Sequence, residues 1–247
     1  MGPGPFGRIL ATAVLGLLLG CEGVVHRASG DEGELAQARE RMVDEQIAAR
    51  GVSDLRVLAA LRKVPRHAFV DPSFAARAYD DTPLPIGHGA TISQPYIVAA
   101  MSELASVTPG EKVLEVGTGS GYQAAILAEL GAEVYTIEIE EPLATRAGET
   151  LKRLGYTRVH VRHGDGYRGW PEAAPFDAVV VTAAPPAVPP ALREQTALGG
   201  RLVIPVGTDW QELELHSKRA DGSFEVRRVF PVRFVPMRPG EPAPSDD

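Results

Sequence analysis

The stretch Val113–Gly121 has the sequence VLEVGTGSG, and the remaining motifs of the chain are understood from it. Its first half is a short apolar run with β-branched residues, which predicts a buried strand. Its second half carries glycine at alternate positions, and residues 122–130 are rich in strong helix formers. Glycine suits such a turn because it adopts positive φ and lets a ligand approach bare backbone. Strand, glycine turn and helix together are typical of a nucleotide-binding α/β unit.

The spacing of these glycines distinguishes two kinds of loop. The dinucleotide fingerprint G-x-G-x-x-G ends on a glycine at its sixth position, which Tyr122 occupies in this chain. With Glu115 ahead of the first glycine, the pattern acidic-x-G-x-G resembles the S-adenosylmethionine (SAM) loop of class I methyltransferases. A carboxylate suits this donor, which is a sulfonium zwitterion without a pyrophosphate. The resemblance implies a cofactor site that includes Glu115, Gly117, Thr118, Gly119 and Gly121. A glycine turn without a ligand is the alternative for this motif taken alone.

Composition narrows the classes of function. A chain of 247 residues with 44% hydrophobic residues can form one large globular domain with extensions. The net charge of −7 argues against a general surface for nucleic acid. A metal site is not expected, because the chain has one cysteine, scattered histidines and no H-E-x-x-H motif.

Residues 1–21 predict a leader. Arg8 is their only charge, and Ile9–Gly20 is an apolar run of signal-peptide length that is short for a membrane span. The run ends in LLGC, which resembles a bacterial lipobox and would make Cys21 a lipidated mature N-terminus. A later translation start, or an unordered leader on a cytosolic enzyme, are the alternatives. We expect a flexible tether over 22–34, one folded domain over 35–238 and a disordered tail over 239–247.

A long loop precedes the glycine motif. Residues 35–50 and 53–64 predict two packing helices, and the segment Asp81–Pro95 then has the composition of a loop. Long ordered loops in compact domains tend to be functional. Pro95 opens a helix that extends to Ala105, so Ser93 lies just before a helix N-terminus. Ser93 either caps this helix or holds a carboxylate where amides and dipole favour an anion, and the two interpretations share one geometry.

Acidic residues follow the next two strands. Glu133–Glu138 predicts a second strand, and an acid at its tip, Glu138, can accept both hydroxyls of a ribose. After the third strand, at 159–162, Asp165 lies between Gly164 and Gly166. Its place suits the amino group of an adenine, and we favour this role over a simple turn aspartate. Further strands are predicted at 176–181, 201–207, 212–217 and 224–228. This order predicts a doubly wound, mostly parallel α/β sheet with extra N-terminal helices.

Taken together, the motifs resemble the protein-L-isoaspartate O-methyltransferase family over roughly 35–237. The loop Thr91–Pro95, with the sequence TISQP, is the most specific motif, because general class I methyltransferases do not share it. The other motifs that carry the resemblance are residues 115–125, Gly164–Gly166, Pro175–Asp177, Thr182–Ala184, Pro205–Gly207 and Val232–Pro236. The chain departs from the family pattern at Ala90, where many relatives have glutamine, and in its leader.

The resemblance implies an activity and a site. A methyl group would pass from SAM to the free α-carboxylate of an L-isoaspartyl residue, leaving S-adenosylhomocysteine. The methyl ester would then re-form a succinimide, and hydrolysis of the succinimide would give some normal aspartate. Carboxylates are ionised at pH 7, so no general base is needed. The sulfonium of the donor is already a good leaving group, so no metal is needed either. We expect damaged proteins as partners and a monomeric enzyme. Ser93 would orient the carboxylate with the main chain of Thr91 and Ile92, and Arg233, Phe234 and Val235 would offer main chain to the peptide. The cofactor contacts would add Glu138, Asp165, Gly166 and Gln211 to the glycine loop.

Three other readings of the sequence stay open. Tyr122 argues against a nicotinamide-dependent oxidoreductase, and the Ser93 loop argues against a methyltransferase for another substrate. An exported lipoprotein that retains the fold as a binding module gains weight from Cys21. Cofactor supply favours the cytosol, and lipidation at Cys21 is the one case in which we expect a membrane partner.

Overall fold

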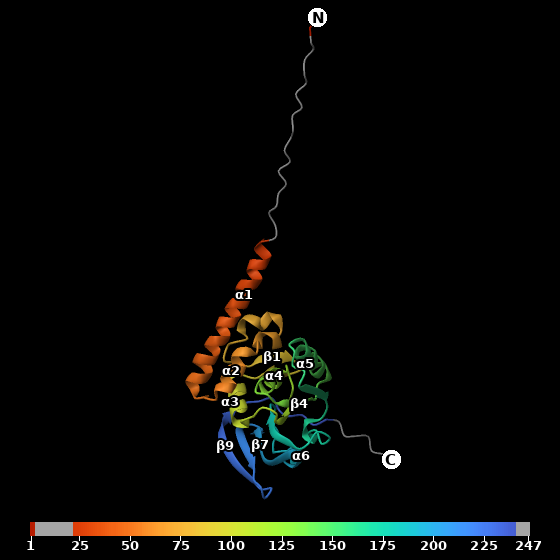
Figure 1. Ribbon diagram of the computed structural model, residues 1–247. Helices are drawn as coiled ribbons and strands as arrows, with labels where there is room; N and C mark the ends of the chain where they lie inside the picture. The colour runs from red at the N-terminus through yellow and green to blue at the C-terminus, as the bar shows by residue number, and fades with distance from the viewer. Residues whose placement is uncertain (3–21, 241–247) are drawn as a thin grey trace, which may run out of the picture. The chain divides into compact units, whose positions relative to one another are not determined.

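The computed structural model describes residues 1–2 and 22–240, with backbone alone over 22–31 (Figure 1). The chain forms two compact units, Met1–Glu34 and Leu35–Asp247. Most of the predicted leader, Cys21 included, and the tail beyond Gly240 lie outside the described residues. Helix α1 covers Glu22–Arg41, so the backbone of the segment expected as a flexible tether is helical. Extending an existing helix costs far less than nucleating one, which explains how the helix at 35–41 continues toward the N-terminus.

The second unit is built on a seven-stranded sheet in the order β5-β4-β3-β6-β7-β8-β9. Strands β3 to β7 pair in parallel, and β8 and β9 add antiparallel at one edge. The predicted doubly wound, mostly parallel sheet is confirmed. The strands are β3 (Lys112–Val116), β4 (Glu133–Glu138), β5 (Val159–His163), β6 (Phe176–Val181), β7 (Thr196–Gly207), β8 (Gln211–Lys218) and β9 (Phe224–Val232). The order reverses beside β3, and ligands bind such sheets at the carboxyl ends of the strands around that point.

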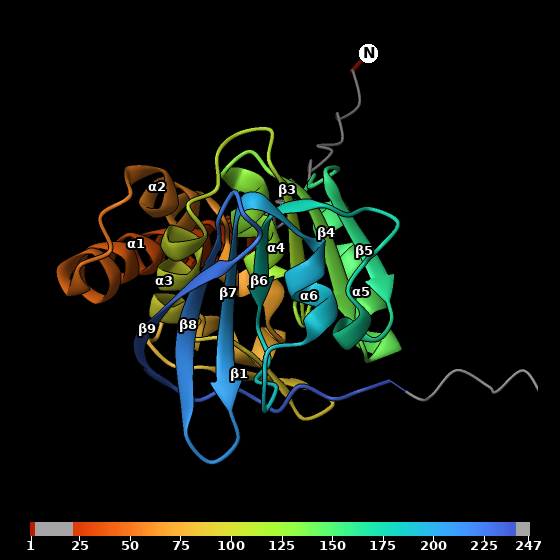
Figure 2. The same ribbon diagram turned by 90° about the horizontal axis from the view of Figure 1, so that it is seen from below.

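Side-chain alternation along β3 and its neighbours produces two hydrophobic cores. Val113 and Val180 face the larger core, which packs against α3, α4 and α5. Leu114 and Val179 face the smaller core, which α6 covers from the other side (Figure 2). The helices are α2 (Leu55–Lys63), α3 (Pro95–Ala105), α4 (Tyr122–Glu129), α5 (Glu141–Arg153) and α6 (Pro190–Gln195).

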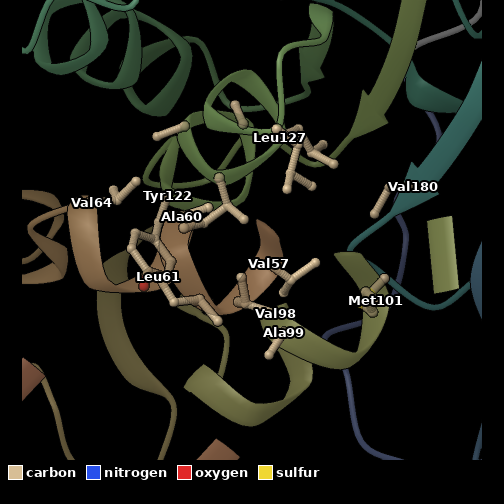
Figure 3. Packing of buried hydrophobic residues seen from close by; sticks show 14 of the residues in the cluster. Val57, Ala60, Leu61, Val64, Val98, Ala99, Met101, Tyr122, Leu127 and Val180 are labelled. Carbon is tan, nitrogen blue, oxygen red and sulfur yellow. The ribbon is translucent and has the colours of Figure 1, made fainter. Parts of the chain in front are cut away.

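The extra helices before the sheet are structural. Figure 3 shows Val57 and Leu61 of α2 packed near Tyr122 of α4, and Tyr122 also meets the ring of Phe69 edge-on at 5.5 Å. Asp54 caps α2, because its carboxylate accepts a hydrogen bond from Arg56 N at 2.8 Å. Between α1 and α2 the chain passes through a π-helical turn at Met42–Ile47 and a 3-10 turn at Ala48–Arg50.

The segment expected as a plain loop at 81–95 contains a small hairpin, β1 (Leu84–Gly87) with β2 (Ala90–Ile92). Leu84 and Ile86 alternate with exposed residues and are buried, which favours a strand. The turn between the strands carries positive φ at Gly87, His88 and Gly89. Arg146 of α5 donates a hydrogen bond to the Ile86 carbonyl and ties the hairpin to the main fold.

Candidate active site

A cavity of about 310 Å³ opens at the carboxyl ends of β3 and β4, where the strand order reverses. Its volume lies within the range of small-molecule sites. It is lined by His88, Gly89, Ala90, Thr91, Val116, Gly117, Gly119, Ile137, Glu138, Ile139, Gly166, Thr182, Ala183, Val235, Pro236, Met237 and Arg238. Apolar groups form most of this wall, and Glu138, His88 and Arg238 supply its ionisable side chains.

Bare backbone is a requirement of this wall. Gly117 has φ of +97°, and a Cβ on it would lie 2.4 Å from the Thr182 hydroxyl, which donates a 2.6 Å hydrogen bond to the Gly117 carbonyl. A Cβ on Gly166 would lie 2.4 Å from Val116 Cγ1. A larger residue at either position would collide with these neighbours, so the backbone of the wall would have to shift.

Two residues of the loop serve the fold and do not line the cavity. Thr118 is buried, and its hydroxyl is 2.7 Å from that of Thr136. Gly121 has φ of +88° at the start of α4, and its Cα faces Leu151, whose side chain a Cβ would approach to 3.1 Å. Of the four loop residues assigned to the cofactor, Gly117 and Gly119 are therefore the ones at the cavity.

Glu138 lies at the cavity as predicted, and its carboxylate is already oriented. Its Oε2 accepts the Gly119 N–H at 2.7 Å, and its Oε1 accepts the Glu140 N–H at 3.0 Å. Each carboxylate oxygen has a second lone pair, so each can accept one more donor. A vicinal diol, with two hydroxyl donors, matches this group.

Glu115, assigned to the cofactor, is instead enclosed in the core. It is 0% exposed, its Oε2 accepts the Thr136 hydroxyl at 2.5 Å, and it does not line the cavity. The other oxygen, Oε1, has no hydrogen-bond partner among the described residues. Burial raises the pKa of the Glu115 carboxyl to about 8, and the charge of nearby Glu138 adds to the rise against the Thr136 hydrogen bond.

Glu115→Gln should remove a pH dependence of stability. Because the folded pKa is about 8 and the ordinary value is 4.5, folding takes up a proton between these values, so the wild-type unfolding free energy falls as pH rises toward 8. Glutamine has no such titration, so the variant should lack this fall and gain a few kcal/mol relative to wild type above pH 8. Urea unfolding from pH 5 to 9 measures it, with exposed Glu149→Gln as control. Parallel pH profiles for wild type and Glu115→Gln would contradict the raised pKa.

Asp165 and Gln211 also differ from their predicted roles. Asp165 caps a 3-10 turn, its carboxylate accepting Tyr167 N at 2.8 Å, and it does not line the cavity. This is the turn-aspartate alternative, and the neighbouring Gly166 is the residue at the cavity wall. Gln211 holds the main chain of Phe234 instead, accepting Phe234 N at 2.6 Å and donating to its carbonyl at 3.2 Å.

For the activity that the resemblance implies, Gln211→Ala should therefore impair peptide binding and spare cofactor binding. Loss of both hydrogen bonds frees Phe234, whose neighbours form one wall of the second groove described below. We expect the KM for an isoaspartyl peptide to rise by roughly fivefold, about the loss of one net hydrogen bond. SAM titration should give an unchanged Kd, and exposed Gln37→Ala is the matched control. A rise in the SAM Kd without a change in KM would show that Gln211 contacts the cofactor, as the sequence predicted.

A second, larger groove of about 790 Å³ holds Ser93. Arg233, Phe234 and Val235 line it as predicted, with Thr91, whereas Ile92 is 3% exposed and does not. Ser93 does not cap α3. Gln94 occupies that position, and its carbonyl accepts Ile97 N at 3.0 Å and Val98 N at 3.2 Å without a side-chain cap. The capping alternative for Ser93 is thus not what the structure shows.

The groove and the cavity share four lining residues, which are Thr91, Thr182, Val235 and Pro236. A group in one space can therefore face a group in the other across these residues. The sequence motif Thr182–Ala184 marked this strand end, but nothing in the sequence indicated that it would separate two ligand spaces.

Several polar contacts beside the cavity and the groove involve residues that the sequence did not indicate. Asp81 Oδ2 accepts Gln94 Nε2 at 2.7 Å and Arg50 Nη1 at 2.5 Å, which fixes the chain beside Ser93. At the cavity, Glu140 is 2.8 Å from Arg238 Nη2 and 3.4 Å from His88 Nδ1. Each of these pairs joins segments far apart in the chain, which sequence periodicity does not report.

Among the described residues, no group of three or more His, Cys, Asp or Glu residues is arranged to hold a metal ion. None of their helices is long and apolar enough to cross a membrane.

Solved structures share this fold. One titled protein-L-isoaspartate O-methyltransferase has a TM-score of 0.74 and 29% identity, covering 80% of this chain and 65% of that one. A Plasmodium falciparum structure, titled as a putative protein-L-isoaspartate O-methyltransferase in complex with S-adenosyl-L-homocysteine, has a TM-score of 0.72 and 27% identity, covering 81% and 98%. Fold and cavity together place the chain among class I SAM-dependent methyltransferases.

Sequence comparison gives the family. The model of the protein-L-isoaspartate(D-aspartate) O-methyltransferase family matches residues 37–241. A protein of Gloeobacter violaceus named protein-L-isoaspartate O-methyltransferase is 59% identical over 202 residues, covering 81% of this chain and 98% of that protein. One of the same name from Opitutus terrae is 56% identical over 232 residues, covering 93% and 98%. The chain belongs to the protein-L-isoaspartate(D-aspartate) O-methyltransferase family.

Proposed function

We propose that this chain transfers the methyl group of SAM to the free α-carboxylate of L-isoaspartyl residues in damaged proteins and peptides. One observation carries the proposal: the cavity and the Ser93 groove share the wall made by Thr91, Thr182, Val235 and Pro236. The two spaces adjoin at these residues, so a donor in the cavity and a carboxylate in the groove would lie next to each other. The names of the relatives support the same activity.

The cavity fits SAM on its own evidence. Gly117, Gly119 and Gly166 line the cavity with main chain alone, and Glu138 can still accept two hydroxyl donors from a ribose. Val116, Ile137 and other apolar groups suit the flat face of an adenine. When bound, SAM supplies a methyl group on a positively charged sulfur, which is a good leaving group.

The protein residues then have to position the acceptor. An isoaspartyl carboxylate is ionised at pH 7 and needs no base. The Ser93 hydroxyl can donate a hydrogen bond to one carboxylate oxygen and leave the other free to attack. Thr91 lies in the wall of both spaces, and Gln211 and Asp81 hold the two sides of the groove. Orientation of this kind can supply several kcal/mol of barrier lowering.

The direct test uses two peptides that differ only in one linkage. Purified protein should transfer radiolabelled methyl from SAM to an isoaspartyl peptide and not to its aspartyl twin. Equal transfer to both peptides, or to neither, would overturn the proposal. Binding of NADH in place of SAM in a thermal-shift comparison would favour the oxidoreductase alternative.

A cytosolic location belongs to the same proposal, because SAM is made in the cytosol. A monomeric state is a separate part of the proposal. Fractionation and palmitate labelling of wild type and Cys21→Ala test the location. Label that follows Cys21 into the membrane fraction would favour the lipid-anchored alternative. Light scattering during size-exclusion chromatography measures the oligomeric state.

A further inference from the structure

The groove that holds Ser93 continues beyond the reacting centre. A second hollow of about 360 Å³ lies between α3 and β9 and shares Arg50, Tyr96 and Phe230 with the groove. The Arg50 guanidinium lies 3.6 Å from the centre of the Tyr96 ring, and the rings of Tyr96 and Phe230 are 6.2 Å apart. The hollow then extends to Arg227 and Glu103. Together the groove and the hollow follow α3 from Tyr96 to Leu104.

A bulge in β9 aims Arg227 into this groove. The ladder pairs Leu215 with Arg227 and Leu213 with Phe230, with a register shift between them. Leu213 and Leu215 are two residues apart and share one face of β8, so their partners Arg227 and Phe230 share that face as well. Without the extra residue, side chains three positions apart would point to opposite faces.

The charges along the groove do not balance. The residues that line the groove and the hollow include Arg50, Arg227 and Arg233 but one acid, Glu103, whose Oε1 accepts the N–H groups of Ser53 and Asp54 at 2.7 Å. Arg50 is paired with Asp81 at 2.5 Å. Arg227 and Arg233 are exposed, and within the described part of the chain neither forms an ion pair or a side-chain hydrogen bond.

We infer that the groove between α3 and β9 holds the peptide segment on one side of the isoaspartyl residue and that Arg227 and Arg233 favour acidic side chains in that segment. The inference rests on the proposed function. Pro95 to Leu104 spans about 13 Å along α3 at ~1.5 Å per residue. An extended peptide covers this distance in about four residues at ~3.3 Å each. An acid roughly three to five residues from the isoaspartate would therefore meet Arg227, and one closer would meet Arg233.

The test is a set of isoaspartyl peptides with a glycine–serine background. A single aspartate is moved from the fifth residue before the isoaspartate to the fifth after it, and a matching series carries lysine. Wild type, Arg227→Glu and Arg158→Glu are compared by kcat/KM for methyl transfer. They are also compared by fluorescence anisotropy of peptide binding in the presence of S-adenosylhomocysteine. Arg158 is an exposed arginine beside β5, at the opposite edge of the sheet, so its variant controls for net charge.

We expect aspartate near the third to fifth residue on one side to raise kcat/KM and affinity by about threefold over the neutral peptide, and less at 0.5 M NaCl. Arg227→Glu should invert the order of the aspartate and lysine peptides at that position, and Arg158→Glu should keep the wild-type order. Because the readout is a ratio within one variant, a loss of total activity does not affect it. Equal binding of aspartate and lysine peptides by wild type would overturn the inference. Absent methylation with retained acidic preference in binding would overturn the proposed activity instead.

Discussion

Ser93→Ala should lower kcat for an isoaspartyl peptide by roughly 100-fold, because alanine cannot orient the carboxylate and a small misplacement of the attacking atom is costly. The SAM Kd should stay within about twofold of wild type, since Ser93 lines the groove and not the cavity. Methyl-transfer kinetics and isothermal titration with SAM measure the two quantities separately.

Two further variants decide whether Ser93 acts through its hydroxyl. Ser93→Thr retains a donor and should recover part of the turnover. Ser223→Ala removes a hydroxyl from an exposed turn and should behave as wild type. A loss of turnover, SAM affinity and thermal stability together in Ser93→Ala would show that the residue is structural.

Glu138→Ala should raise the SAM Kd by about 100-fold, which corresponds to the loss of two hydrogen bonds to a charged acceptor. The carboxylate also accepts Gly119 N and Glu140 N, so its removal loosens the glycine loop as well. Titration calorimetry gives the Kd. Exposed Glu141→Ala, three positions along the chain, is the matched control and should bind SAM as wild type does.

Direct contact and loop bracing can be separated with S-adenosylhomocysteine and its 2′-deoxy analogue. Wild type should bind the ribose form more tightly, because a diol offers two donors to Glu138. The variant should bind the two ligands about equally. If Glu138→Ala leaves the Kd unchanged, Glu138 does not take part in the site.

Local patterns predicted much of the fold. The strand of Val113–Val116, the turn at Gly117–Gly121 and the helix after it were all predicted, because each depends on neighbours within a few residues. Glu138 lies at the cavity, since an acid at a strand tip in a parallel sheet lies at the edge where ligands bind, and its contact with a ribose stays a prediction.

Side-chain direction explains why Glu115 lies in the core and not at the cavity. Leu114 and Val116 face the smaller core, so Glu115 between them points toward the opposite face of the sheet. There it meets Thr136, its register partner on β4. Proximity in sequence to the glycine loop suggested a cofactor contact, whereas the alternation of the strand directs the carboxylate into the core.

Sequence alone indicated the succession along the chain of the parallel strands and the helices between them, the glycine turn and the resemblance to the family, because hydrophobic period, glycine placement and short motifs are properties of adjacent residues. The tertiary structure alone decided which side chains meet. Thr91, Thr182 and Val235 form one wall between two ligand spaces, and Gln211 supports Phe234 from a neighbouring strand. These contacts follow from strand order and register, which bring together residues that no local pattern relates.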